Sequence, residues 1–289
     1  MEKWNQTSKD FILLGLLPPN QTGLLLLLLI IFAFVLALVG NSRITVLIFL
    51  DPRLHTPMYF LLSQLSLMDL MYISTTVPKM AINFLSGHNS ISFLGCGVQI
   101  FFFITIACSE GLILASMAYD RFVAICHPLH YPVRMSKIMC LTMIIGTWIL
   151  GSIHSLAYTT YALHLPYCKS RAINHFLCEI PSMMPLVCMD TWDYEYMLFV
   201  ILILLLPFLG ITLRKAFTTC STHLTVVTIL LCSFCLHLSP VRSPEEDKNL
   251  AVFYTILTPM LNPIIYSLRN KEVLGAMRRM CGMFSPWKK

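Results

Sequence analysis

The chain has 289 residues, of which 57% are hydrophobic and 12% are charged, and its formal net charge is +6. Soluble globular domains contain about 25% charged residues, so this composition excludes an ordinary soluble protein. The only soluble alternative is a protein with several fully buried helices. The apolar residues gather in blocks about as long as a helix that crosses a bilayer, roughly 20 residues. We therefore predict an all-α integral membrane protein.

Residues 1–23 form a short polar segment, predicted to be an extracellular tail. The segment lacks the basic region, short apolar run and small-residue cleavage site of a signal peptide, so the first apolar block, from Leu24, is expected to act as an uncleaved anchor. Two glycosylation sequons lie here, Asn5-Gln6-Thr7 and Asn20-Gln21-Thr22. Asn20 is too near the first block for easy access by the glycosylating enzyme, so Asn5 is the predicted acceptor.

Seven apolar blocks follow within residues 24–268, each long enough, or nearly so, to cross a bilayer. They are Leu24–Leu50, Pro57–Lys79, Leu94–Tyr119, Met139–Tyr161, Tyr196–Leu213, Thr222–Leu238 and Leu250–Leu268. The prediction is a seven-transmembrane helix bundle. An odd number of spans places the two termini on opposite sides of the membrane.

The distribution of basic residues predicts which side is which. With the N-terminus outside, most lysine and arginine residues fall in the inner loops and the tail, among them Arg53, Arg121, Arg134 and Arg279. This asymmetry follows the positive-inside rule, and it also places both sequons outside and the C-terminus in the cytoplasm. The net positive charge is thus a sign of membrane topology, and nucleic acid is not an expected partner.

The long outer loop between Ala162 and Glu195 is polar and rich in cysteine. Four cysteines are predicted on the outer side, where an oxidising compartment favours disulfides: Cys96, Cys168, Cys178 and Cys188. Four cysteines allow three pairings, and their positions alone do not choose among them. Zinc binding is disfavoured because the cysteines show no close paired spacing.

Three ionisable residues fall inside predicted spans, where charge is costly and usually functional: Arg43, Asp69 and Glu110. Asp69 and Glu110 are each near mid-span. Two carboxylates facing one bundle interior repel each other unless they share a proton or bind a cation. Two interpretations stay open, a site for a sodium ion and a protonated, hydrogen-bonded pair.

Residues 269–289 form a predicted cytoplasmic tail in which basic residues alternate with Val273, Leu274, Met277 and Met280. This pattern fits an amphipathic helix that lies on the inner membrane surface in contact with lipid. The alternative is a disordered basic tail.

Four motifs, in order and at the predicted helix ends, carry a family resemblance. They are Leu54-His55-Thr56-Pro57-Met58-Tyr59-Phe60, Met117-Ala118-Tyr119-Asp120-Arg121 with its continuation to Tyr131, Lys215-Ala216-Phe217-Thr218-Thr219-Cys220, and Pro259-Met260-Leu261-Asn262-Pro263-Ile264-Ile265-Tyr266. With them the chain resembles the vertebrate odorant receptors, within the rhodopsin-like G-protein-coupled receptors, from Asn5 to Arg279.

The resemblance implies roles for particular residues. It pairs Cys96 with Cys178 and Cys168 with Cys188, and it makes Asn41 a polar anchor of the first helix. It assigns Asp69 to an ion site, with Glu110 as an acid that odorant receptors share. The implied activation switch comprises Asp120 and Arg121, an ion pair at the inner end of the third helix, and Asn262, Pro263 and Tyr266 of the seventh helix.

A ligand site is expected among the outer halves of the third, fifth and sixth helices. The candidate residues are Phe103, Ile104, Ala107, Cys108, Phe199, Phe234 and Leu238; the alternative is that several of them only pack helix against helix. No charged side chain occupies the expected mid-cavity positions, which predicts small, uncharged, volatile odorants. The implied activity is activation of an olfactory-type heterotrimeric G protein of the cAMP pathway from the plasma membrane, with no cofactor except the candidate sodium ion.

The chain departs from the family pattern at the inner ends of the fifth and sixth helices. Gly210-Ile211-Thr212-Leu213 runs directly into Arg214-Lys215, so a segment of roughly 20 residues, about the length of one span, is missing. Arg43 also occupies a position where the family has an aliphatic residue. Because a G protein docks at this inner end in the superfamily, we predict impaired trafficking or signalling, and a decayed, non-signalling receptor is the alternative to a working one.

Two other classes of function are weighed against a receptor. No nucleophile and base, and no set of metal ligands, face a common cleft, so an enzyme is not expected. A channel or transporter would use the buried Asp69 and Glu110, but the chain lacks the internal repeats that transporters usually show.

Overall fold

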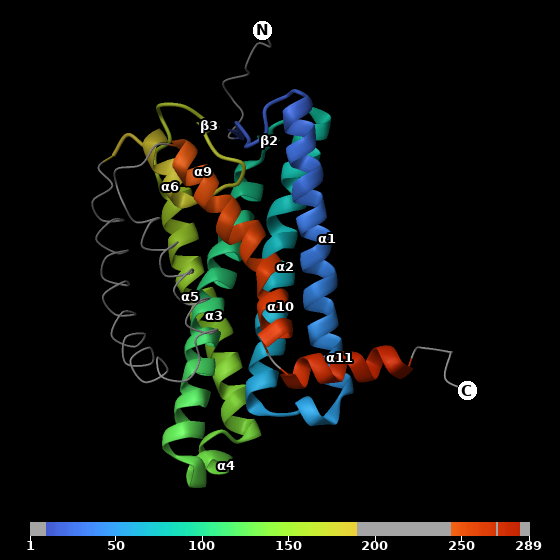
Figure 1. Cartoon of the computed structure of the whole chain (residues 1–289). Helices are drawn as coiled ribbons and strands as arrows, with labels where there is room; N and C mark the ends of the chain where they lie inside the picture. Colours follow the sequence, from blue (N-terminus) through green and yellow to red (C-terminus); the bar gives the residue numbers. More distant parts are fainter. Residues whose placement is uncertain (1–9, 190–243, 270, 284–289) are drawn as a thin grey trace.

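The computed structural model describes residues 10–189, 244–269 and 271–283. Four long helices run along the bundle: α1 (Gln21–Leu50), α2 (Pro57–Ser86), α3 (Phe93–Cys126) and α5 (Lys137–His164) (Figure 1). Each is long and apolar enough to cross a membrane, with mean hydropathies of 3.1, 1.2, 2.0 and 1.6 over an 18-residue stretch. The first four predicted spans lie within these helices, whereas the spans predicted at 196–213 and 222–238 lie outside the described residues.

The last long stretch of helix is divided into three segments. They are α9 (Pro244–Val252), the π-helical η4 (Phe253–Leu257) and α10 (Thr258–Arg269). The sequence predicted one uninterrupted span from Leu250. The helix begins earlier because Glu245, Glu246 and Asp247 in its first turn complement the positive end of the helix dipole. The π-helical turn was not predicted because hydrophobic periodicity does not distinguish it from an α-helix.

The outward surfaces of the long helices are apolar. Side chains such as Leu28, Phe32, Ile149 and Ile153 are more than half exposed. A soluble monomer rarely exposes a contiguous apolar surface of this kind. The described helices therefore present to their surroundings the surface that a bilayer requires.

A small sheet lies at one end of the bundle, here called the sheet end. It has the order β2-β1-β3, formed by β1 (Phe11–Leu13), β2 (Ser90–Ile91) and β3 (Ala172–Ile173). Strand β1 pairs antiparallel with β2 and parallel with β3. Phe11 is fully buried and meets the ring of Tyr167 edge-on, with 5.2 Å between ring centroids. Residues 1–23 were predicted only as a polar extracellular tail, and the sheet was not predicted, because strands of two or three residues carry no periodicity.

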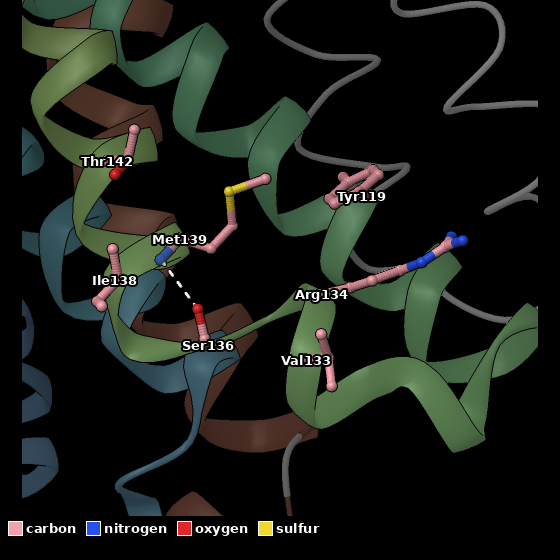
Figure 2. Close-up of a pocket in the computed structure, with 7 residues that line it drawn as sticks. All are labelled: Tyr119, Val133, Arg134, Ser136, Ile138, Met139 and Thr142. Atoms are coloured by element: carbon pink, nitrogen blue, oxygen red, sulfur yellow. Dashed lines mark hydrogen bonds between the residues drawn. The ribbon is translucent and has the colours of Figure 1, made fainter.

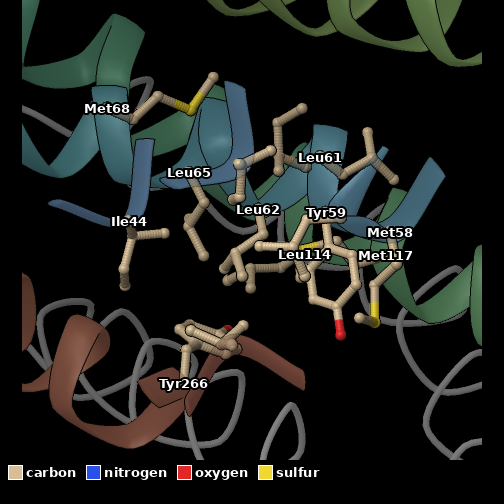
Figure 3. Close-up of a cluster of buried hydrophobic side chains, with 14 of the residues drawn as sticks. Ile44, Met58, Tyr59, Leu61, Leu62, Leu65, Met68, Leu114, Met117 and Tyr266 are labelled. Carbon is tan, nitrogen blue, oxygen red and sulfur yellow. The ribbon is translucent and has the colours of Figure 1, made fainter. Parts of the chain in front are cut away.

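The main core lies between α2 and its neighbours. Leu62, Leu65 and Met68 of α2 pack with Ile44 of α1 and with Tyr266 of α10 (Figure 3). These side chains come from segments far apart in the sequence. The core therefore holds α10 against the first two long helices.

The opposite end of the bundle, here called the α11 end, carries short helices and the last described segment. The short helices are η1 (Pro52–Leu54), η2 (Pro128–His130) and α4 (Tyr131–Arg134). Helix α11 (Lys271–Met283) lies across the ends of the long helices, roughly perpendicular to α1 (Figure 1). Its Val273 and Ala276 are buried in the main core.

Two polar contacts fasten α11 to the bundle. Tyr59 of α2 donates a hydrogen bond to Glu272 at 2.6 Å, and Arg279 lies 2.6 Å from the carboxylate of Asp51 after α1. The hydrogen bond from Arg279, together with one from the Arg53 backbone, lowers the pKa of the Asp51 carboxyl. The lowered pKa means that the contact is retained at neutral pH and is lost as pH falls through that lowered value.

We expect the docking of α11 to withstand mild acid. Because the ordinary pKa of aspartate is about 3.9, weakening of the Asp51–Arg279 contact should begin only below about pH 4. A fluorophore attached to α11 can report this release, with Asp51→Asn as the control that removes the acid-dependent step. Release of α11 between pH 5 and 7 in the unsubstituted protein would contradict the expectation.

Candidate functional site

Pro263 shapes the contact between α10 and α1. A proline has no backbone N–H, so Pro263 leaves the Pro259 carbonyl without its usual helical donor. The side-chain amide of Asn41, on α1, donates to that carbonyl at 2.9 Å and to Ala37 O at 3.0 Å. Gly40 permits the close approach, because a Cβ at its position would lie 2.8 Å from Pro263 Cγ. Asn41 therefore acts as the polar anchor between helices that the resemblance implied.

Asn262 connects α10 to α2 through the predicted ion site. Its amide nitrogen lies 3.1 and 3.0 Å from the two carboxylate oxygens of Asp69, which is 1% exposed. Glu110 of α3 is 4% exposed and close enough to Asp69 for their charges to interact. Within the described part of the chain, Glu110 Oε1 has no hydrogen-bond partner. The two acids and Asn262 thus form one buried polar cluster between three helices.

At the α11 end of α3, the contacts of Asp120 differ from the simple ion pair with Arg121 that was predicted. Asp120 accepts a hydrogen bond from Tyr131 of α4 at 2.8 Å. Its other carboxylate oxygen and Arg121 Nε find no hydrogen-bond partner among the described residues. Adjacent residues on a helix do not face each other, so a direct bond between the two was not guaranteed by their order in the sequence. Burial and the bond to Asp120 raise the pKa of Tyr131, which therefore remains the donor at neutral pH.

Two disulfides fix the long loop at the sheet end. Cys96 at the start of α3 is bonded to Cys178, with 5.5 Å between Cα atoms, and Cys168 is bonded to Cys188, with 6.0 Å. These are the pairings that the resemblance implied. The first bond brings the segment around Cys178 down onto the ends of the helices.

A buried polar cluster that was not predicted from the sequence lies next to Cys178. His175 Nε2 lies 3.0 Å from Glu179 Oε1, and both side chains are at most 2% exposed. Tyr254 in η4 donates a hydrogen bond to Glu179 Oε2 at 2.7 Å. We name His175, Glu179 and Tyr254 the loop clamp, because they join the long loop to the helix formed by α9, η4 and α10. The signal available in the sequence was a His and a Glu spaced i, i+4 around a bonded cysteine.

The structure divides the candidate ligand residues of α3. Phe103 is partly buried between Tyr72 and Tyr254, with ring centroids 5.1 and 6.0 Å away. Ile104 instead packs against the core beneath the loop, Ala107 is exposed, and Cys108 is partly buried. Phe199, Phe234 and Leu238 lie outside the described residues. Of the four candidates that the structure describes, Phe103 is therefore the one with a ring contact to Tyr254 of the loop clamp.

Comparison with known proteins decides the family. Residues 40–223 match the profile of the 7 transmembrane receptor (rhodopsin family), and residues 196–283 match that of the olfactory receptors. Human olfactory receptor 2L13 is 68% identical over 308 aligned positions that cover 99% of each chain, and human olfactory receptor 2L3 is 59% identical over 97% of each. The chain belongs to the olfactory receptor family.

Membership settles several predictions about the receptor. It is a seven-transmembrane, multi-pass plasma-membrane protein of a non-enzymatic signalling class, as predicted. Mouse olfactory receptor 2V1 is a more distant relative, 50% identical over 95% of each chain. The alignment with the human 2L13 receptor has more positions, 308, than the receptor has residues, 289, so it contains gaps opposite this chain. A gapped alignment is what a missing inner segment requires.

A shallow pocket of about 370 Å³ lies at the α11 end of the receptor, where α3, α4 and the start of α5 meet (Figure 2). Tyr119, Val133, Arg134 and Met139 are among the residues that line it, and Ser136 caps α5 by accepting a bond from the Met139 backbone at 3.3 Å. No prediction from the sequence pointed to this pocket. Its lining combines apolar side chains with one arginine.

We expect Tyr254→Phe to loosen the loop clamp of the receptor. The substitution leaves Glu179 with one partner fewer in a buried position, which costs about 1–3 kcal/mol of stability. Thermal unfolding of purified receptor measures this loss. Tyr119→Phe, on α3, is the control for removing a phenol hydroxyl that makes no hydrogen bond to a described residue, and an equal loss in both variants would argue against the clamp.

Proposed function

We propose that this receptor binds small, mostly apolar, uncharged odorants beneath the loop clamp and activates an olfactory-type heterotrimeric G protein at the α11 end. The observation that carries the proposal is the set of contacts made by the helix α9–η4–α10. Tyr254 at its upper part contacts both Phe103 and Glu179, while Asn262 and Tyr266 further along lie in the central polar cluster and the main core. One helix therefore touches the ligand side, the buried acids and the inner end.

The sheet end is assigned to the extracellular side. Both disulfides lie there, and disulfides persist in oxidising compartments. The α11 end then faces the cytoplasm, in accord with the positive-inside distribution of Arg53, Arg134 and Arg279. In this orientation Asn5 is the extracellular glycosylation site.

The contacts of Phe103 support an apolar ligand. Phe103, Tyr72 and Tyr254 offer aromatic surface, which favours binding by apolar contact and ring edges. Glu179, beside Tyr254, already has two partners, because Tyr254 donates a hydrogen bond to it and His175 lies 3.0 Å away. A charged ligand would need to break these bonds, so uncharged odorants are favoured.

The Asp69–Glu110 cluster is assigned to a sodium ion. Asn262 holds Asp69 in place, and Glu110 Oε1 has no hydrogen-bond donor among the described residues, which leaves a buried oxygen suited to a cation. Residues suited to a multivalent metal are not grouped there, since the described residues contain no cluster of three or more His, Cys, Asp or Glu side chains. A single positive charge would relieve the repulsion between the two acids.

The exposed apolar side chains of the α11 end are assigned to the G protein. Leu129 is 91% exposed and Val133 is 78% exposed, on short helices beyond the end of α3. Large apolar groups exposed outside the bilayer mark a contact with another protein. These residues adjoin Tyr131, which donates a hydrogen bond to Asp120 of α3. A partner docked on them would therefore respond to a movement of α3.

The test is surface-labelled expression with a cAMP readout against a panel of volatile odorants. We expect an odorant response in the native chain. Phe103→Ala should lower its potency by about tenfold, and Leu129→Ala should lower its maximal signal. Leu156→Ala, an exposed leucine on the lipid-facing side of α5, is the matched control and should leave the response unchanged. Surface expression without any odorant response, in the native chain and in one with a family-length inner segment restored, would refute the proposal.

If only the restored chain responds, the missing segment limits coupling. Ligand binding to the native chain would then be intact, as shown by odorant-induced stabilisation of purified receptor. If the native chain responds as well as the restored one, the shortened inner end is tolerated, and the predicted impairment is wrong.

A further inference from the structure

Arg43 lies on the outward face of α1. The buried residues of this part of the helix include Asn41, Ile44 and Leu47, whereas Arg43 and its neighbour Ser42 are exposed. Other exposed residues of the same face, at spacings of three and four, are Leu36, Val39, Val46 and Leu50. Arg43 is therefore a cation within an apolar stripe that faces the membrane.

Nothing in the described part of the receptor neutralises this cation. Arg43 takes part in no ion pair or hydrogen bond there, in contrast to Arg279, which contacts Asp51. A charged side chain in contact with hydrocarbon is costly, and proteins relieve the cost by extending the side chain to the polar headgroups or by pairing it. The position of Arg43 therefore calls for an anionic partner from outside the bundle.

The depth of Arg43 selects the partner. Arg43 precedes Asp51 by eight residues, about 12 Å along the helix. Asp51 is at the level of α11, which lies across the end of the bundle (Figure 1). An extended arginine covers part of this distance, so its guanidinium would meet a phosphate that sits beside α1 slightly inside the usual headgroup plane.

We propose that Arg43, with the Ser42 hydroxyl beside it, binds the phosphate of an anionic phospholipid in the cytoplasmic leaflet. The planar guanidinium donates two parallel hydrogen bonds to phosphate oxygens, and the apolar stripe contacts the acyl chains. Exposed Arg53 and Arg278 at the same end add favourable charge for the acidic leaflet. The choice of leaflet rests on the orientation given under the proposed function, whereas the lipid site itself does not depend on odorant or G protein.

The test uses the full-length receptor in lipid nanodiscs of phosphatidylserine and phosphatidylcholine. Native mass spectrometry after release counts the anionic lipids that stay bound. We expect Arg43→Leu to lower the retention of phosphatidylserine relative to phosphatidylcholine by about fivefold, and Arg43→Lys to lower it less, because a lysine keeps the charge but loses the paired donors. Arg171→Leu, which removes one exposed arginine at the sheet end, is the matched control and should change nothing.

A second measurement needs no substitution and separates the sources of the anion. Phosphatidylserine with a photoreactive acyl chain should label the native receptor on the stripe between residues 36 and 50, and inorganic phosphate should not compete. Equal lipid retention in Arg43→Leu and the native receptor, or labelling that avoids this stripe, overturns the proposal. Loss of receptor–receptor cross-links in Arg43→Leu with unchanged lipid retention would instead show that a second copy supplies the partner, and it also overturns the proposal.

Discussion

Replacing Cys96 and Cys178 together with serine should destabilise the receptor by about 2–5 kcal/mol and largely abolish its surface expression. The bond joins residues separated by 82 positions, so its loss releases a long loop in the unfolded chain. It also frees the segment next to Glu179, whose bond to Tyr254 holds the long loop on the last helix. Thermal unfolding of purified receptor and cell-surface labelling measure the two effects.

The second disulfide is the matched control for the first. Cys168 and Cys188 are separated by 20 positions, so the entropic part of the loss should be smaller by about 1 kcal/mol when both are changed to serine. Neither of these cysteines adjoins a residue of the loop clamp in the sequence, whereas Cys178 directly precedes Glu179. A double substitution of Cys168 and Cys188 that is as damaging as that of Cys96 and Cys178 would show that loop closure and the clamp do not set the difference.

Asp69→Asn should remove the response of the receptor to sodium. At a sodium concentration ten times the dissociation constant, a site formed by Asp69 and Glu110 stabilises the native receptor by about 1.4 kcal/mol, and the substitution takes away one of its two charges. Asparagine retains a side-chain oxygen that can accept the bond from Asn262. The measurement is thermal unfolding in sodium chloride compared with choline chloride at equal ionic strength.

Two controls give this prediction its meaning. Glu110→Gln should abolish the sodium effect in the same way, whereas Glu272→Gln, an exposed acid on α11, should leave it intact. If the native receptor ignores sodium but its stability depends on pH, and Asp69→Asn removes that dependence, the two acids share a proton. That outcome would refute the sodium assignment while keeping the buried pair.

The parts of the structure that the sequence predicted are those in which one strong local signal decides. Long apolar blocks placed α1, α2, α3 and α5, because a bilayer demands helices of that length. Disulfide partners came from the family resemblance, since four cysteines alone left three pairings. The family itself rests on short motifs at helix ends, and the comparisons confirm it.

The parts that the sequence did not predict depend on contacts between remote residues. The loop clamp joins Glu179 to Tyr254, 75 positions apart, and Tyr131 becomes the partner of Asp120 only through the turn that starts α4. The strands of the small sheet are too short to leave a pattern. Such features arise when packing brings separate segments together, and no local rule on propensity or spacing contains them.

The bond between Asn41 and the Pro259 carbonyl also constrains the order in which the receptor can be completed during synthesis. The two residues are 218 positions apart, so the first helix enters the membrane long before its acceptor has been translated. Until then the amide of Asn41 has the carbonyl of Ala37, one turn earlier in its own helix, as a temporary acceptor. Nascent chains that stop before the last helix should therefore insert α1 yet remain clients of the quality-control machinery, and maturation would begin only when Pro259 emerges.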